Sequence, residues 1–301
     1  MIVKPFVKWV GGKGQLINII HNFYPTGMGT IYKKYAEPFI GGGAVLFDIL
    51  SNYFFDEIYI SDVNKELINA YKIIKSDYKV LISQLKLIQD QYHSLDIKSR
   101  SKFFYQQREK FNNIKSKNIK SKNIKSNAII SAVLFIFLNK TCYNGLYRVN
   151  KQGLFNVPAG TYKRPLICDD TNLYRISQKL QNVVIKHASY EKSLSFIDSS
   201  TFVYLDPPYR PLNSTSYFTS YDESNFNDKS QINLSKYFDK ITQKGAVAML
   251  SNSDPKNNDI NDDFFDLLYN KYNLIRIKAN RLINRNSDAR GQISEILVTN
   301  Y

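Results

Sequence analysis

The segment 33-KKYAEPFIGGGAVLFDIL-50 changes its sequence pattern twice over a short length of chain. Tyr35–Phe39 predicts the end of a strand, Ile40–Gly43 predicts a loop, and Ala44–Leu50 has apolar residues at helical spacing. A second apolar strand over Glu57–Ser61 and a helical pattern over Asn64–Ile74 repeat this order. Strand, loop and helix in alternation predict a parallel α/β sheet.

The same pattern returns in the C-terminal part of the chain. Short apolar segments predict further strands over Val183–Ile185, Thr201–Leu205, Gly245–Leu250 and Ile293–Tyr301. We therefore expect a Rossmann-like, doubly wound sheet built from residues 1–65 and 181–301, interrupted by a helical and β-hairpin insertion over residues 66–180.

The insertion has a composition of its own. Residues 75–127 are rich in Lys, Gln and Ser, and a five-residue repeat begins at Asn113, Asn118 and Asn123. We expect a mobile basic loop at the repeat, with direct contact to a DNA backbone as the alternative. Ala128–Asn139 predicts a buried helix, and Gly- and Asn-rich turns over residues 143–165 predict hairpin-like structure.

The charge of the chain points to a polyanionic partner. The formal net charge is +15, and Lys and Arg contacts to phosphates supply most non-specific affinity for nucleic acid. A compositional bias towards Lys, Asn, Ile and Tyr is the alternative explanation. Two cysteines give no disulfide framework, and three scattered histidines without a Cys pair argue against a zinc site.

The chain shows no targeting signal that we recognise. Its first residues lack the apolar core of a signal peptide, and the longest apolar run, Ala128–Leu138, is about half the length needed to span a bilayer. We expect a cytoplasmic protein, associated with the nucleoid, with no membrane partner and no metal.

The segment Val203-Tyr204-Leu205-Asp206-Pro207-Pro208-Tyr209 carries chemistry. An apolar strand delivers a carboxylate and two prolines to the carboxyl edge of the predicted sheet, where such folds bind ligands. Because proline restricts φ and lacks an N–H, Asp206 and the Pro207 carbonyl can act as rigid acceptors for a substrate amino group, with Tyr209 as a stacking face. Holding both hydrogens of an aromatic amine favours the tetrahedral nitrogen that attacks a methyl group; a simple Pro-Pro turn is the alternative.

The glycine loop predicts a nucleoside cofactor. Glycines let the backbone approach a ligand closely, and Asp62, about twenty residues further on at the end of the next strand, suits a ribose diol. The spacing is not that of a dinucleotide loop. The segment Phe6–Lys13 is not a phosphate loop either, because Val7 and Gly14 replace the glycine and the Ser or Thr that such a loop requires.

Taken together, these segments resemble the Dam-type adenine-N6-specific DNA methyltransferases, the D12 class, alpha group. The resemblance rests on Lys8-Trp9-x-Gly-Gly-Lys13, Glu37-Pro38-Phe39-x-Gly41-x-Gly43, Asp62-Val63-Asn64, Cys142-Tyr-Asn-Gly-Leu-Tyr-Arg148, Phe155-Asn-Val-Pro158, Asp206-Pro-Pro-Tyr209, Tyr209-Arg-Pro-Leu with Tyr217-Phe-Thr219, and Ser251-Asn-Ser-Asp254. The segments occur over nearly the whole chain and in the family's order. One departure is Ala159-Gly160, where the family has Phe-Gly.

The resemblance implies S-adenosylmethionine as the methyl donor and a short motif in double-stranded DNA as the substrate, with GATC as the leading sequence. It also allows for a cognate restriction endonuclease that acts separately. It implies that residues 66–180 form a target-recognition domain and that the remainder is the catalytic domain, which methylates a flipped adenine at N6 by direct in-line transfer.

The resemblance also assigns residues. It implies catalytic roles for Asp206, Pro207 and Tyr209. It implies cofactor contacts by Trp9, Lys13, Glu37, Phe39, Gly41, Gly43, Asp62 and Asp206. It implies DNA contacts by Lys8, Tyr143, Asn144, Leu146, Arg148, Pro158 and Tyr162. Among these, Lys8 matches a lysine that reads the first guanine, Tyr143 an aromatic residue inserted into the duplex, and Arg148 a base-reading arginine; ordinary packing is the alternative for Leu146 and Pro158.

The sequence excludes some other activities and leaves others open. A cytosine-C5 methyltransferase needs a Pro-Cys nucleophile, and a zinc deaminase needs a Pro-Cys-x-x-Cys pair; the chain has neither. Methylation of cytosine N4, or of an amine in RNA or protein, uses similar chemistry and stays open. A DNA-binding module without activity also stays open, although the complete Asp206–Tyr209 motif argues against it.

Overall fold

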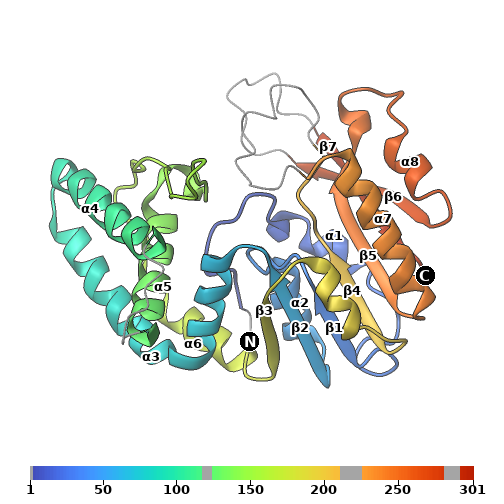
Figure 1. Ribbon diagram of the computed structural model, residues 1–301, viewed down its shortest axis with the longest axis horizontal. Helices are drawn as coiled ribbons and strands as arrows, with labels where there is room; N and C mark the ends of the chain where they lie inside the picture. The colour runs from blue at the N-terminus through green and yellow to red at the C-terminus, as the bar shows by residue number, and fades with distance from the viewer. Residues whose placement is uncertain (1–2, 117–123, 211–225, 281–291) are drawn as a thin grey trace.

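The computed structural model describes residues 3–116, 124–210, 226–280 and 292–301, and within them it contains a seven-stranded sheet in the order β3-β2-β1-β4-β5-β7-β6 (Figure 1). The strands span Lys34–Glu37 (β1), Glu57–Asp62 (β2), Val183–His187 (β3), Thr201–Leu205 (β4), Val247–Ser253 (β5), Asn273–Asn280 (β6) and Gln292–Thr299 (β7). Strands β1 to β5 are parallel, and β7 is antiparallel to both β5 and β6.

The order of the strands places a ligand site at one point on the sheet edge. From β1 the chain proceeds outward through β2 and β3, and it then returns to β4 on the other side of β1. In the parallel register Ala36 of β1 lies opposite Val203 of β4, so their carboxyl ends are neighbours. Such a topological switch point is where open α/β sheets bind ligands.

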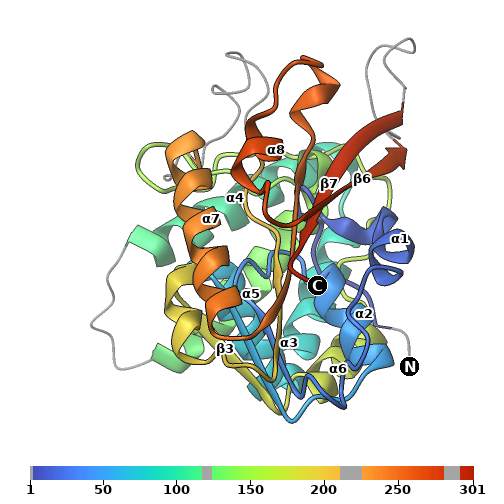
Figure 2. The same ribbon diagram turned by 90° about the vertical axis from the view of Figure 1, so that its right-hand side faces the viewer.

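Helices cover both faces of the sheet, as a doubly wound fold requires. They span Ile17–His21 (α1), Ala44–Asn52 (α2), Lys65–Ser94 (α3), Ile97–Ser116 (α4), Ile124–Thr141 (α5), Asp170–Lys179 (α6), Asp228–Gln243 (α7) and Phe264–Leu268 (α8). Alternate strand residues enter two separate cores: Tyr35 packs with α2 and α3, whereas Ala36 packs with α7 and α8. Helices α3, α4 and α5 gather at the opposite end of the molecule from α7 and α8 (Figure 1), and Figure 2 views the molecule from the end that carries α7 and α8.

The predicted α/β sheet is confirmed, with one strand added. β4 has the predicted bounds, and β2, β3, β5 and β7 differ from prediction by a few residues at their ends. β6 was not predicted, although its Ile275-Arg276-Ile277-Lys278 alternation is a strand signal. It pairs along its whole length with β7.

The prediction of a mobile loop over the repeat is wrong at both flanks. Residues 113–116 form the end of α4, and residues 124–127 form the start of α5; residues 117–123 lie outside the described chain. Lys, Gln and Arg are good helix formers, and Phe104 and Phe111, two helical turns apart, are fully buried. These few aromatic residues are enough to dock a largely polar helix.

The predicted hairpin over residues 143–165 is not a regular pair of strands. Two antiparallel bridges are present, Cys142 with Ala159 and Val149 with Phe155. The ladder cannot continue past Asn156 because Pro158 has no N–H to give. On the outer edge, Asn112 of α4 bonds both the N–H and the carbonyl of Phe155 and so attaches this segment to α4.

Helix α5 is, among the described residues, long and apolar enough to cross a membrane by length and composition. Its residues from Ala132 to Leu138 are, however, buried in the protein against α3 and α4. The predicted buried helix over 128–139 is therefore confirmed as part of α5.

Candidate active site

The Asp206 carboxylate lies at the carboxyl end of β4, beside the switch point. Its Oδ1 accepts a hydrogen bond from Lys13 Nζ at 2.6 Å and another from Ser251 Oγ at 3.0 Å. Ser251 comes from β5 and is held in turn by the Tyr204 hydroxyl at 3.0 Å. Among the described residues, both side-chain donors to Asp206 bond Oδ1, and none bonds Oδ2.

The chain after Asp206 is held firmly. Pro207 is buried, and Gln231 Nε2 of α7 donates to the Pro208 carbonyl at 3.2 Å. The Tyr209 hydroxyl donates to Glu295 Oε2 of β7 at 2.5 Å, and Lys13 Nζ lies 4.7 Å from the centre of the Tyr209 ring. Burial raises the pKa of both Tyr209 and Glu295, so the phenol remains a proton donor at neutral pH.

The glycine loop follows β1 and is closed by Asp62 from the end of β2. Gly41 N donates to Asp62 Oδ2 at 3.1 Å, and Asn64 N donates to Asp62 Oδ1 at 2.8 Å. Gly41 and Gly43 have φ values of +46° and +76°, and a Cβ on Gly43 would collide with the Tyr71 hydroxyl. Only glycine combines this backbone with so close an approach.

Glu37 and Phe39 flank the start of this loop. Glu37 is 2% exposed, and its Oε2 accepts a hydrogen bond from the Tyr35 hydroxyl at 2.6 Å. Burial raises the pKa of Glu37 well above its ordinary value, against the opposing effects of Tyr35 and Lys13. The Phe39 ring stacks on Tyr190 with a centroid separation of 5.2 Å.

The N-terminal segment passes beside both the loop and Asp206. A Cβ on Gly41 would lie 2.9 Å from Trp9 Cδ1, and the Trp9 ring stacks on Tyr147 at 5.8 Å. The structure therefore brings the predicted cofactor residues into one connected group around the switch point, with Lys13 linking the N-terminal segment to Asp206.

The predicted DNA residues form a second group next to the first. Lys8 Nζ lies 3.2 Å from the Tyr162 hydroxyl, and Asn139 Nδ2 bonds both the Lys8 and the Gly145 carbonyls at 2.8 Å. Tyr143 is 55% exposed and precedes Asn144, whose φ is +53°. This turn therefore presents an aromatic ring to solvent.

The remaining DNA candidates differ in exposure. Pro158 is exposed, and its carbonyl accepts from Tyr143 N at 2.9 Å. Arg148 is half-buried, and its Nε donates to Asn156 Oδ1 at 2.8 Å. Leu146 packs partly on the hydrophobic core, as the packing alternative expects. Nearby, burial and the positive charge of Lys8 lower the pKa of Lys140.

Sequence reasoning missed the groups that orient the motif. Ser251 was noted only as part of a resembling segment, and Glu295 and Gln231 were not identified. The one available signal was an acidic residue within an apolar strand, Glu295 in Ile293-Ser294-Glu295-Ile296. No group of three or more His, Cys, Asp or Glu side chains in the described part of the chain could hold a metal ion.

The sheet with its antiparallel β7, the glycine loop after β1 and the carboxylates after β2 and β4 are consistent with a methyltransferase fold. The sequence model of the D12 class N6 adenine-specific DNA methyltransferases matches residues 9–283. The chain therefore belongs to this family of adenine-specific DNA methyltransferases.

Three relatives match this chain over at least 94% of their own length. The chain is 46% identical to the Type II methyltransferase M.MjaIII of Methanocaldococcus jannaschii, with 100% of both chains covered. It is 36% identical to the Type II methyltransferase M1.LlaDCHI of Lactococcus lactis subsp. cremoris over 99% of this chain and 96% of the relative. It is 30% identical to the DNA adenine methylase of Escherichia coli strain K12 over 98% of this chain and 94% of the relative.

Proposed function

We propose that the protein methylates N6 of adenine in a short motif of double-stranded DNA, with GATC as the leading sequence. One observation carries this proposal: at the switch point, the Asp206 carboxylate is held by Lys13 and Ser251 next to a buried Pro207 and a fixed Tyr209 ring. This is an arrangement of rigid acceptors and an aromatic face, which suits a planar base that carries an amino group.

S-Adenosylmethionine fits the second part of the site. The left-handed glycines let the loop turn tightly against Trp9 and Tyr71, and the carboxyl groups of Asp62 and Glu37 lie at this loop. The residues that would hold it are Trp9, Lys13, Glu37, Phe39, Gly41, Gly43, Asp62 and Asp206. When bound, it supplies an electrophilic methyl group on a sulfonium.

The protein's own groups prepare the amine. Asp206 Oδ2 and the Pro207 carbonyl each accept one hydrogen of the exocyclic amino group, which withdraws the nitrogen lone pair from the ring. Tyr209 stacks on the base, and Glu295 prevents the phenol from rotating. Fixed acceptors of this kind typically contribute about 2.7–4 kcal/mol each to transition-state stabilisation.

Access to the amine requires base flipping, which costs a few kcal/mol. The exposed Tyr143 ring is suited to fill the gap in the stack, with Asn144 against the orphan base. Arg148 and Lys8 are the proposed readers of guanine, and Leu146 and Pro158 are the proposed contacts to a thymine methyl group. Tyr162, which bonds Lys8, would hold that lysine in position. Residues 66–180 would then act as the target-recognition domain.

The cellular setting follows from the same proposal. Because two relatives are named Type II methyltransferases, a separate restriction endonuclease with the same target is a candidate partner. We place the protein in the cytoplasm on nucleoid DNA.

Expression in a host that lacks DNA methylation, followed by sequencing of modified bases, tests the proposal. N6-methyladenine at every copy of one short motif is the expected result, and that motif is expected to be GATC. N4-methylcytosine, or no modified base in DNA, would overturn it.

A further inference from the structure

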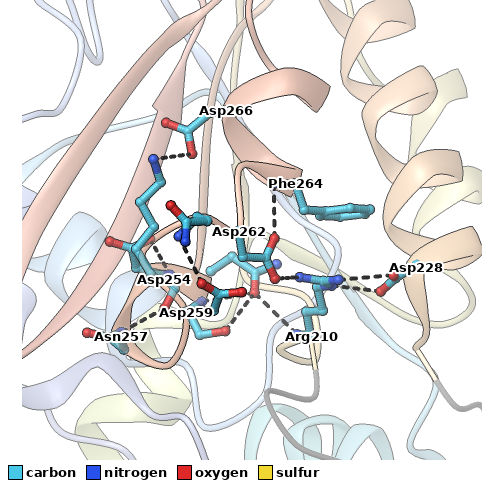
Figure 3. Close-up of polar contacts among 12 residues, drawn as sticks. Arg210, Asp228, Asp254, Asn257, Asp259, Asp262, Phe264 and Asp266 are labelled. Carbon is cyan, nitrogen blue, oxygen red and sulfur yellow. Dashed lines mark hydrogen bonds and ion pairs between the residues drawn. The ribbon is translucent and has the colours of Figure 1, made fainter.

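Arg210, the residue directly after Tyr209, is bound by two separate elements. Its Nε and Nη2 donate to the two carboxylate oxygens of Asp228, at 2.7 and 3.1 Å, and its Nη1 donates to Asp262 Oδ2 at 2.6 Å. Figure 3 shows the guanidinium between these aspartates and beside Phe264, whose ring centre is 4.3 Å away. Asp228 begins α7, and Asp262 lies just before α8.

The backbone of Arg210 is held as well. Arg210 N lies 3.4 Å from Asn252 Oδ1, Asn252 Nδ2 donates to Gln231 Oε1 at 3.2 Å, and Gln231 Nε2 donates to the Pro208 carbonyl. Asn252 and Gln231 are fully buried. The peptide over residues 208–210 is thus fastened to both β5 and α7.

We infer that Arg210 is a positioning residue for the base-binding motif, and this inference rests on the proposed function. Consecutive Cα atoms are only 3.8 Å apart, so the two ion pairs of Arg210 restrict where the Tyr209 peptide can lie relative to Asp206. A planar guanidinium with one bidentate partner and one further partner fixes both position and direction. Loss of this support would allow the acceptors and the ring to drift out of alignment.

The contacts argue against a role for Arg210 in holding a DNA phosphate. All three of its guanidinium nitrogens already donate to carboxylates, and its side chain is 18% exposed. Two aspartates more than balance its charge, so this corner of the site offers a phosphate no net positive attraction.

Arg210→Ala tests the inference, with Lys34→Ala as a matched control. Lys34 also pairs with two carboxylates, Asp198 and Glu57, lies 4.4 Å from the centre of the Phe196 ring, and has a side chain that is 15% exposed. It sits at the amino ends of β1 and β2, away from Asp206. The two variants therefore remove comparable ion pairs at opposite edges of the sheet.

We expect the turnover number of Arg210→Ala to fall at least tenfold, since a misplacement of about 1 Å at a reacting group can cost about 10²-fold. Affinity for duplex DNA and for S-adenosylmethionine should stay within about twofold. In Arg210→Ala, the fluorescence of 2-aminopurine at the target position should show a flipped base that is less firmly stacked than in the wild type. Arg210→Lys should recover part of the turnover that Arg210→Ala loses. The melting temperature of Arg210→Ala should fall by about as much as that of Lys34→Ala. The turnover number of Lys34→Ala should equal that of the wild type.

The wild-type protein is assayed first on duplex DNA. If it transfers no methyl group to adenine, the proposed function fails. If it does, equal turnover in Arg210→Ala and Lys34→Ala would overturn the positioning role alone, as would a loss explained entirely by weaker DNA binding.

Discussion

Replacement of Asp206 by asparagine is the most informative single change in this site. The substitution keeps the size and shape of the side chain and removes its charge. Lys13 Nζ and Ser251 Oγ both donate to Oδ1, so in Asp206→Asn the amide oxygen must take the Oδ1 position. The amide NH2 then takes the Oδ2 position, where, in the proposed clamp, it points a donor, in place of an acceptor, at the amino group of the base.

The expected loss follows from this geometry. One well-aimed acceptor is removed and a repulsive contact replaces it, so turnover should fall by about 10²–10³-fold, equivalent to about 2.7–4 kcal/mol. Asp206→Ala should lose at least as much. Transfer of labelled methyl groups to a duplex measures turnover, and fluorescence anisotropy measures DNA affinity, which should stay within about threefold because most of that affinity comes from phosphate contacts.

Ser251→Ala serves as the control for indirect effects. It removes one donor to Oδ1 but leaves the carboxylate and Lys13 in place, so turnover should fall by tenfold at most, equivalent to about 1.4 kcal/mol. If Asp206→Asn retained turnover within threefold of the wild type, the carboxylate would not be the acceptor, and the proposed clamp would be wrong.

Three further predictions follow from other parts of the molecule. Arg148→Ala should relax sequence selection more than it weakens DNA binding, because a bidentate guanine contact is worth about 1–3 kcal/mol of discrimination; an unchanged methylation pattern in a genome would contradict this. Burial raises the pKa of Glu37, so the folded protein keeps a proton that the unfolded chain releases above its ordinary value of 4.5; stability from this group is present in acid and is lost as the pH rises towards the raised pKa. The melting temperature of Glu37→Gln should therefore rise increasingly above that of the wild type as the pH increases above about 5; if the two melting temperatures changed in parallel with pH, the prediction would be wrong. Finally, DNA affinity should decline steeply and log-linearly with salt, given the net charge of +15; a flat salt titration would argue against phosphate contacts.

The parts of the site that were predictable are encoded by consecutive residues. Two segments each combine a structural signal with a chemical group. One is a strand followed by Asp206-Pro207, and the other is a strand followed by Gly41 and then by Asp62. The carboxyl ends of parallel strands lie on one edge, so these segments meet once the strand order is known. The local sequence pattern was therefore sufficient to predict these parts of the site.

The supporting residues were not predictable, because tertiary pairing brings them in. Glu295 reaches Tyr209 from a position 86 residues away, and only because β7 is inserted antiparallel between β5 and β6. Ser251 depends on the register of β5 against β4. Helix α4 was not predicted for a different reason: it docks through few apolar residues, Phe104 and Phe111 among them, and its polar composition conceals the helical period.

The segment from Lys8 to Lys13 links the two groups of the site. At one end the Lys8 N–H and carbonyl both bond the Asn139 side chain, which also holds the Gly145 carbonyl. Gly145 has a φ of +66°, and a Cβ there would lie 2.7 Å from Lys8 Cβ, so the loop can approach this closely only as glycine. At the other end Lys13 bonds Asp206. Five residue steps span at most about 18 Å, so the proposed DNA-reading loop and the base clamp share one short support. If the proposed DNA-reading loop bound a wrong sequence, the shared support would also shift the clamp. This gives a physical reason why the turnover number would be lower on a wrong sequence.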